Sequence, residues 1–326
     1  MSRRYKRFPR PLLVMLVLAG ALMVTILPES YRKLIEPTAY AASFTVNTAD
    51  DHNDGVCNGA DCSLREAINA VNAGAGGDTI SFNIPGGGVR TINVTSALGG
   101  LNITKAVTID GTTQPGFTSS PLIELSGANA GSVAGLNIAA ANVTVKGLII
   151  NRFANNGINI ASTAAIIQGN FIGTNSAGTA AVGNSPGGIK LNGASGCTIG
   201  GTTAAARNVI SGNSGDGILI TNSATNNVVQ GNYIGVDVSG TSAVSNTGDS
   251  LGGVNIASSN NNTIGGSAAG AGNVLSGGDG SNAYGIQINF SSGVIVQGNI
   301  IGYPRFWRHG TYDWWHNCRG TKCDFG

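Results

Sequence analysis

Short segments in which apolar and polar residues alternate are the main pattern of this chain between residues 80 and 302. Gly217-Ile218-Leu219-Ile220 and Gly285-Ile286-Gln287-Ile288 each place Ile at every second position. This period of two is typical of strands that bury one face. No amphipathic helix pattern of useful length occurs in the same stretch. The pattern therefore predicts many short β-strands.

An internal repeat indicates how these strands are arranged. The segment Ile167-Gln168-Gly169-Asn170 returns with small changes at Val229 and again at Val296. The spacing gives a unit of roughly 65 residues whose parts recur in the same order. Each unit contains two smaller steps, each marked by a glycine before an alternating apolar pair. These glycines are Gly135, Gly157, Gly188, Gly217, Gly253 and Gly285.

One such step has a length that suits one coil of a three-sided solenoid. Parallel strands cannot be joined by two-residue hairpins. A solenoid avoids this difficulty, because each strand pairs with its counterpart one coil away, about 4.8 Å along the axis. Inward Ile, Val and Leu side chains then stack on their equivalents in neighbouring coils. We therefore expect an all-β parallel solenoid, a β-helix, over residues 79–302.

Asparagine recurs next to the expected turns. Asn170, Asn232 and Asn299 form one set, and Asn208 and Asn273 form another. Asn tolerates left-handed turn conformations, and stacked Asn side chains can hydrogen-bond along a ladder. We interpret these residues as structural, since the alternative of sugar-contacting amides would require outward-facing Asn.

Residues 42–78 are expected to form an acidic loop followed by a short capping helix. Ser63 and Glu66 have the spacing of a capping box, and Gly74 would end the helix. A helix here would cover the open end of the solenoid. Cys57 and Cys62 lie close together and would form a disulfide in an oxidising compartment. The alternative for this pair is two free thiols.

The segment from Cys62 to Ile68 reads CSLREAI and resembles the CSLREA amino-terminal region of exported bacterial β-helix proteins. The later coils resemble the pectin-lyase-like superfamily. Together the resemblance covers roughly residues 44–302 and implies a right-handed coil. The CSLREA signature carries no assigned chemistry, so it implies no catalytic residue here.

Oxygen-bearing side chains gather in the loop before the helix, at Asp50, Asp51, Asn53 and Asp54. Oxygen ligands at this density can bind Ca²⁺, so calcium is the one cofactor that the sequence suggests. The spacing of an EF-hand is absent, and the alternative is a solvated acidic loop tied by a disulfide. His52, in the same loop, is expected to be solvated.

Catalytic candidates on the solenoid are few. The carboxylates between residues 111 and 279 are Glu124, Asp216, Asp237, Asp249 and Asp279. Glycoside hydrolysis uses two carboxyl groups about 5–10 Å apart, and no adjacent pair in the coils suggests such an arrangement. We therefore predict no catalytic residue.

The composition limits the classes of molecule that this protein is expected to bind. Charged residues make up 10% of the chain and the net charge is +2, without the basic stripe that a nucleic-acid partner requires. We expect a monomeric surface scaffold or adhesin that binds polysaccharide or a cell-surface glycan. A polysaccharide lyase or glycoside hydrolase is the alternative.

Both ends of the chain differ from the solenoid. A basic stretch up to Arg10, an apolar run over 11–27 and Ala39-Tyr40-Ala41 have the order of a signal peptide over residues 1–41. An uncleaved anchor, the one expected route to a membrane, is the alternative. Either would place the rest of the protein outside the cytoplasm, secreted or at the cell surface. All three Trp fall in residues 303–326, an aberrant tail that we interpret as a frameshifted or truncated reading. The alternative is an aromatic tail that caps the end or binds sugars.

Overall fold

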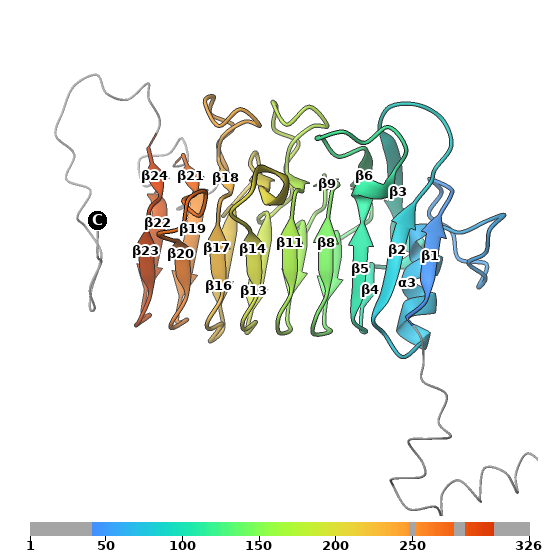
Figure 1. The fold of residues 1–326 in the computed structure, drawn as a ribbon, viewed down its shortest axis with the longest axis horizontal. Helices are drawn as coiled ribbons and strands as arrows, with labels where there is room; N and C mark the ends of the chain where they lie inside the picture. Colours follow the sequence, from blue (N-terminus) through green and yellow to red (C-terminus); the bar gives the residue numbers. More distant parts are fainter. Residues whose placement is uncertain (1–40, 248–251, 277–283, 303–326) are drawn as a thin grey trace, which may run out of the picture. The chain divides into compact units, whose positions relative to one another are not determined.

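The computed structural model describes residues 41–247, 252–276 and 284–302 (Figure 1). The predicted signal peptide, the aberrant tail, Asp249 and Asp279 lie outside these residues. Within the described part of the chain, no helix combines the length and the apolar character that crossing a membrane requires.

Three sheets contain all the named strands, and every pairing between those strands is parallel. Sheet A consists of β1 (Ser43–Val46), β2 (Asp78–Phe82), β5 (Val107–Asp110), β8 (Thr144–Lys146), β11 (Ile166–Gln168), β14 (Thr198–Gly200), β17 (Val228–Gln230), β20 (Thr263–Gly265) and β23 (Ile295–Gln297). Sheet B consists of β3 (Arg90–Thr95), β6 (Ile123–Asn129), β9 (Leu148–Asn151), β12 (Phe171–Ile172), β15 (Val209–Ile210), β18 (Tyr233–Ile234), β21 (Val274–Leu275) and β24 (Ile300–Ile301). Sheet C consists of β4 (Asn102–Ile103), β7 (Leu136–Ile138), β10 (Ile158–Ile160), β13 (Ile189–Asn192), β16 (Ile218–Thr221), β19 (Gly252–Ala257) and β22 (Tyr284–Asn289).

Neighbouring strands in each sheet come from successive coils, so the strands of a sheet lie side by side in a row (Figure 1). The fold is a right-handed parallel β-helix, with the hand that nearly all parallel crossover connections take. The predicted fold class and the predicted coil length are thereby confirmed.

Apolar side chains at equivalent positions stack through the interior. Ile158 of β10 is in register with Ile189 of β13, which is in register with Ile218 of β16. All three side chains are almost completely buried. Burial of one such side chain contributes about 1.5–3 kcal/mol, so each coil is stabilised by the coils on either side.

The glycines that mark the coils open or immediately precede the strands of sheet C. A Cβ atom added to Gly188 would lie 2.6 Å from the carbonyl oxygen of Gly217, and one added to Gly217 would lie 3.0 Å from that of Gly253. Successive coils therefore approach too closely at this corner for a side chain. This close contact explains why the sequence marks each coil with glycine.

The two predicted sets of Asn interleave in one buried ladder between sheets A and B. The Nδ2 atoms of Asn170, Asn208, Asn232 and Asn273 each donate to Oδ1 of the next ladder residue, at 3.1, 2.9, 2.9 and 2.8 Å, and Asn299 is the last acceptor. The two sets alternate because one sequence unit spans two coils. Two further ladders, which the sequence analysis missed, join Asn227 to Asn262 and run through Asn184, Asn213 and Asn246.

Helix α3 (Leu64–Ala73) follows Ser63, whose side chain and that of Glu66 form a reciprocal capping box. Leu64, Ala67, Ile68 and Val71 are buried, and the helix contacts β1, β2 and β4 at the first coils. The structure differs from the sequence analysis at the start of the solenoid, since β1 already pairs with β2 ahead of the helix. Residues 42–78 therefore contribute a strand as well as the loop and the helix.

Candidate functional site

Sheet C carries a stripe of polar side chains on its outer face. Asn102, Asn137, Asn159 and Lys190 occupy equivalent positions on β4, β7, β10 and β13. They point outward because the apolar residues on either side of each point into the core. Nδ2 of Asn137 donates to Oδ1 of Asn102 at 3.0 Å, and Nδ2 of Asn159 donates to Oδ1 of Asn137 at 2.7 Å. The outward-facing amides that sugar binding would require are therefore present, at positions that the sequence analysis did not name.

A groove of about 400 Å³ follows this stripe. Its other lining residues are Gly100, Val133, Ala134, Asn155, Asn156 and Asn192, and no carboxylate lines it. The half-buried Lys190 forms no hydrogen bond or ion pair with any described residue, so its ammonium group is available to a ligand. The groove thus offers amide donors, amide acceptors and one cation along a row of strands.

Asp216 lies in the turn before β16, one coil beyond the strands that line the groove. Gly157 N donates to Gly187 O, and Gly188 N donates to Asp216 O, so Asn156 and Asp216 lie along the same line of turns. Asn255 of β19 donates from Nδ2 to Oδ2 of Asp216 at 3.1 Å, while Oδ1 of Asn255 is buried without a partner. Burial raises the pKa of Asp216, and the hydrogen bond from Asn255 offsets this only in part. An unpaired buried acceptor costs about 1–3 kcal/mol.

The other described carboxylates of the coils have separate partners. Glu124 accepts hydrogen bonds from Thr91, Asn151 and Arg152. Burial alone would raise the pKa of Glu124, but these partners lower it overall. Asp237 accepts from residues of its own turn, 239–242. Among the described residues, no hydrogen bond joins two of the candidate carboxylates.

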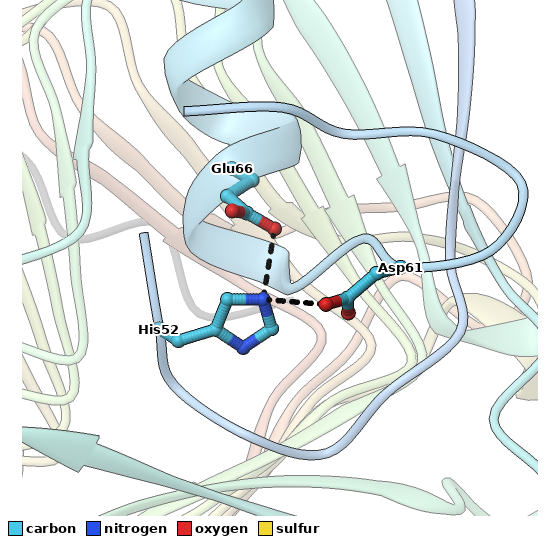
Figure 2. Close-up of side chains that lie close together, drawn as sticks. All are labelled: His52, Asp61 and Glu66. Carbon is cyan, nitrogen blue, oxygen red and sulfur yellow. Dashed lines mark ion pairs between the residues drawn. The ribbon is translucent and has the colours of Figure 1, made fainter. Parts of the chain in front are cut away.

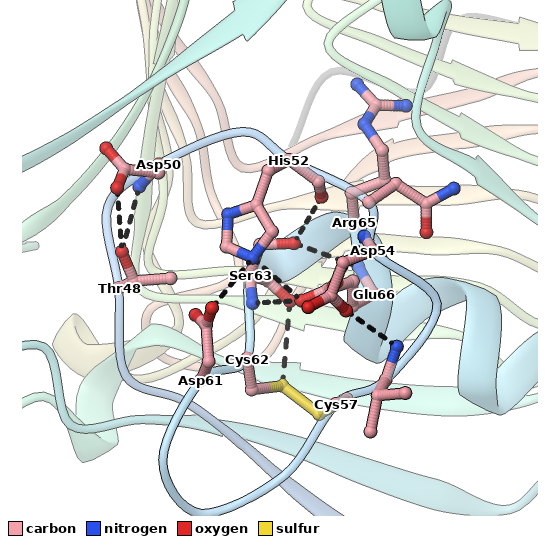
Figure 3. Close-up of polar contacts among 12 residues, drawn as sticks. Thr48, Asp50, His52, Asp54, Cys57, Asp61, Cys62, Ser63, Arg65 and Glu66 are labelled. Atoms are coloured by element: carbon pink, nitrogen blue, oxygen red, sulfur yellow. Dashed lines mark hydrogen bonds and ion pairs between the residues drawn. A yellow bond between two sulfur atoms is a disulfide. The ribbon is translucent and has the colours of Figure 1, made fainter.

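The loop before α3 places the four predicted calcium ligands with different partners. Asp51 lies against Arg65, with Oδ1 at 2.7 Å from Nε and Oδ2 at 2.9 Å from Nη2, and both side chains are buried. Asp50 contacts Thr48 (Figure 3).

Asn53 accepts a hydrogen bond from Asn69. Asp54 accepts a hydrogen bond from the backbone N–H of Val56 (Figure 3). Together with the Asp50 and Asp51 contacts, these bonds direct the four side chains to four different places. The calcium prediction stays a prediction.

Cys57 and Cys62 are joined by a disulfide (Figure 3). The bond closes the turn that carries Asp61, and the buried Cys62 packs with the core of the first coils. Cys197, the free cysteine of the described residues, is also buried, and burial raises its pKa. A buried neutral thiol behaves as a small core residue.

His52 is partly buried and lies against two carboxylates, whereas the sequence analysis expected a solvated side chain. Its Nε2 atom lies 3.3 Å from Oδ2 of Asp61 and 3.2 Å from Oε2 of Glu66 (Figure 2). Burial alone would raise the pKa of Glu66, but backbone N–H groups of Ser63 and Asp54, together with His52, lower it overall. The capping glutamate is therefore held as a carboxylate facing the imidazole.

Of the two features that were missed, one has a signal in the sequence. The outward position on each of the first four strands of sheet C carries Asn or Lys, so aligning these strands on the glycines before them would have shown the stripe. The contact of His52 with Asp61 and Glu66 has no such signal, because it depends on how the loop closes.

No protein-family model matches this sequence, and no curated protein matches it. Among solved structures, the chain is similar to pectate lyase Pel9A at 12% sequence identity. The match covers 82% of this chain and 78% of that chain, with a TM-score of 0.28.

Proposed function

We propose that this protein is an exported β-helix scaffold that binds a polysaccharide along the outer face of sheet C. The observation that carries the proposal is the outward-facing amide stripe of Asn102, Asn137 and Asn159, which lines the groove. Amides both donate and accept hydrogen bonds, as sugar hydroxyls do. Solenoid faces repeat their binding groups along an axis, which suits an extended ligand.

The spacing of the stripe supports a polymeric ligand. The strands that carry Asn102, Asn137, Asn159 and Lys190 are consecutive in sheet C, and neighbouring strands lie about 4.8 Å apart. Three steps give a binding face on the order of 14 Å long. On the next strand, β16, the equivalent position is occupied by the apolar Leu219, so the polar stripe ends at Lys190.

The proposal places the protein outside the cytoplasm as a monomer, secreted or at the cell surface, without a nucleic-acid partner. Three observations support this part of the proposal. Charged residues make up only 10% of the chain, the amino-terminal segment has the order of a signal peptide, and Cys57 and Cys62 form a disulfide. Disulfides persist in oxidising compartments. Separation of cell fractions tests the location.

A glycan array probed with the full chain tests binding, followed by titration with the glycan that is retained. We expect Asn137→Ala and Lys190→Ala to weaken binding. Asn93→Ala on sheet B and Lys146→Ala on sheet A are matched controls, since both residues lie on other sheets. An equal loss of binding in the control variants would overturn the assignment to sheet C.

The same samples distinguish binding from catalysis. Release of reducing ends or of unsaturated products from the retained glycan would contradict the scaffold and favour a hydrolase or a lyase. Retention of the glycan without either product supports the scaffold.

A further inference from the structure

Three potential metal ligands converge where the acidic loop meets the amino terminus of α3. One ligand atom from each of His52, Asp61 and Glu66 lies within 4.8 Å of the other two. Figure 2 shows Nε2 of His52 between the two carboxylates. This nitrogen is buried and has no hydrogen-bond partner among the residues that the structure describes.

Simple ion pairing does not account for this arrangement. A protonated imidazole directs its N–H along one line, toward one acceptor. Here two carboxylate oxygens approach Nε2 at nearly equal distances, 3.3 and 3.2 Å, and neither contact has hydrogen-bond geometry. A neutral imidazole protonated at Nδ1 would instead turn the lone pair of Nε2 toward anionic oxygens, which is unfavourable unless a cation lies among them.

We propose that His52, Asp61 and Glu66 bind a Zn²⁺ ion. Zinc holds His nitrogen and carboxylate oxygen at about 2.0–2.2 Å in a tetrahedron, which places neighbouring ligand atoms about 3.3 Å apart. Both contacts of Nε2 have this length. Calcium instead takes about six to eight oxygens at longer distances, and an imidazole ligand favours zinc over calcium.

The surroundings hold the three ligands in place. The hydroxyl of Ser63 donates to the carbonyl of His52 at 2.7 Å, and Ser63 N donates to Oε2 of Glu66 at 3.0 Å. The disulfide of Cys62 immediately follows Asp61 in the chain. Outer contacts of this kind orient metal ligands. The ion would thus join the loop, the disulfide-closed turn and the helix.

A zinc site at this position would stabilise the cap of the β-helix. Metal binding to a site that exists only in the folded state adds its binding free energy to folding. Because α3 contacts the first strands of two sheets, the ion would hold the loop and the helix against the end of the first coil.

Titration of the chelator-treated full chain with Zn²⁺ alone, followed by calorimetry and thermal unfolding, tests the proposal. We expect His52→Ala and Asp61→Asn each to lose one equivalent of Zn²⁺ and the accompanying rise in Tm. The expected loss of affinity exceeds the ~10–100-fold that removal of an outer contact causes. Asp50→Ala is the matched control, since Asp50 lies in the same loop and contacts only Thr48, and it should bind as the parent does.

Glu66 is left unchanged because it also caps the helix. Asp61, half exposed at 51%, can be replaced with little risk to folding, and circular dichroism without metal checks this. An unchanged number of Zn²⁺ equivalents in both His52→Ala and Asp61→Asn would overturn the proposal. Full displacement of the ion by an equal concentration of Ca²⁺ would also overturn it.

Discussion

Replacement of Asn232 by Ala tests how much the buried amide ladder contributes to the fold. Asn232 is fully buried. Its Nδ2 donates to Ile199 O, Gln230 O and Asn273 Oδ1 at 2.9, 3.0 and 2.9 Å. Its Oδ1 accepts from N and Nδ2 of Asn208 at 3.3 and 2.9 Å. One side chain thus connects three successive coils.

The cost of Asn232→Ala follows from these contacts. The backbone N–H of Asn208 would lose its acceptor inside the core, which costs about 1–3 kcal/mol. Two side-chain hydrogen bonds of the ladder would also be lost, at about 1 kcal/mol each. The free energy of unfolding should therefore fall by about 3–5 kcal/mol. For a domain of this size the Tm should fall by about 10 °C.

Asn299→Ala provides the matched comparison at the last described coil. Asn299 accepts from N and Nδ2 of Asn273 at 3.0 and 2.8 Å, but it is only half-buried. Water can replace the lost acceptor there, so the expected cost is about 1 kcal/mol. Thermal unfolding followed by circular dichroism measures both variants, and hydrogen exchange locates the loosened coils. A Tm of Asn232→Ala within about 2 °C of the parent would refute the reasoning.

Three further predictions concern single side chains. Burial raises the folded-state pKa of Asp216, so ionisation of this carboxyl destabilises the folded state as pH rises. At neutral pH, Asp216→Asn should therefore unfold at a higher Tm than the parent. A difference in Tm that persists below about pH 4 would contradict this. Arg65→Met should leave the buried Asp51 carboxylate unpaired and lower the urea midpoint by the equivalent of about 3–5 kcal/mol; an unchanged midpoint would show that the pair is dispensable. Ser63→Ala removes the side-chain cap of α3 and should cost about 1 kcal/mol in the same assay, whereas no measurable change would mean that the other cap contacts suffice.

The solenoid and its first ladder are predictable because both depend on local, repeated rules. Alternating Ile positions define the buried face, and equivalent coils place equivalent residues in register. The capping box is likewise local, since Ser63 and Glu66 are one helical turn apart. What the repeat did not reveal is that Asn170 and Asn208 belong to one ladder, because the repeated unit is two coils long.

The polar face and the cap contacts depend on information that spacing does not contain. Loops of different length separate Asn102, Asn137 and Asn159, so a fixed repeat length does not align them and only the glycines before the strands do. His52 meets Glu66 because the loop folds back across the helix terminus, held by the hydroxyl of Ser63. Sequence reasoning expected acidic side chains to cluster, but a buried Arg65 requires its own counter-ion and takes Asp51.

The amide ladder has a direction. From Asn170 to Asn273, each Nδ2 donates toward the carboxyl-terminal neighbour. The backbone N–H of the same residue is also satisfied by the next coil, as in the bond from Asn208 N to Asn232 Oδ1. A newly formed coil therefore presents two N–H groups, one from the backbone and one from the side chain, that the ladder asparagine of the next coil accepts. This direction favours folding one coil at a time from the capped end, with each coil serving as the template for the next.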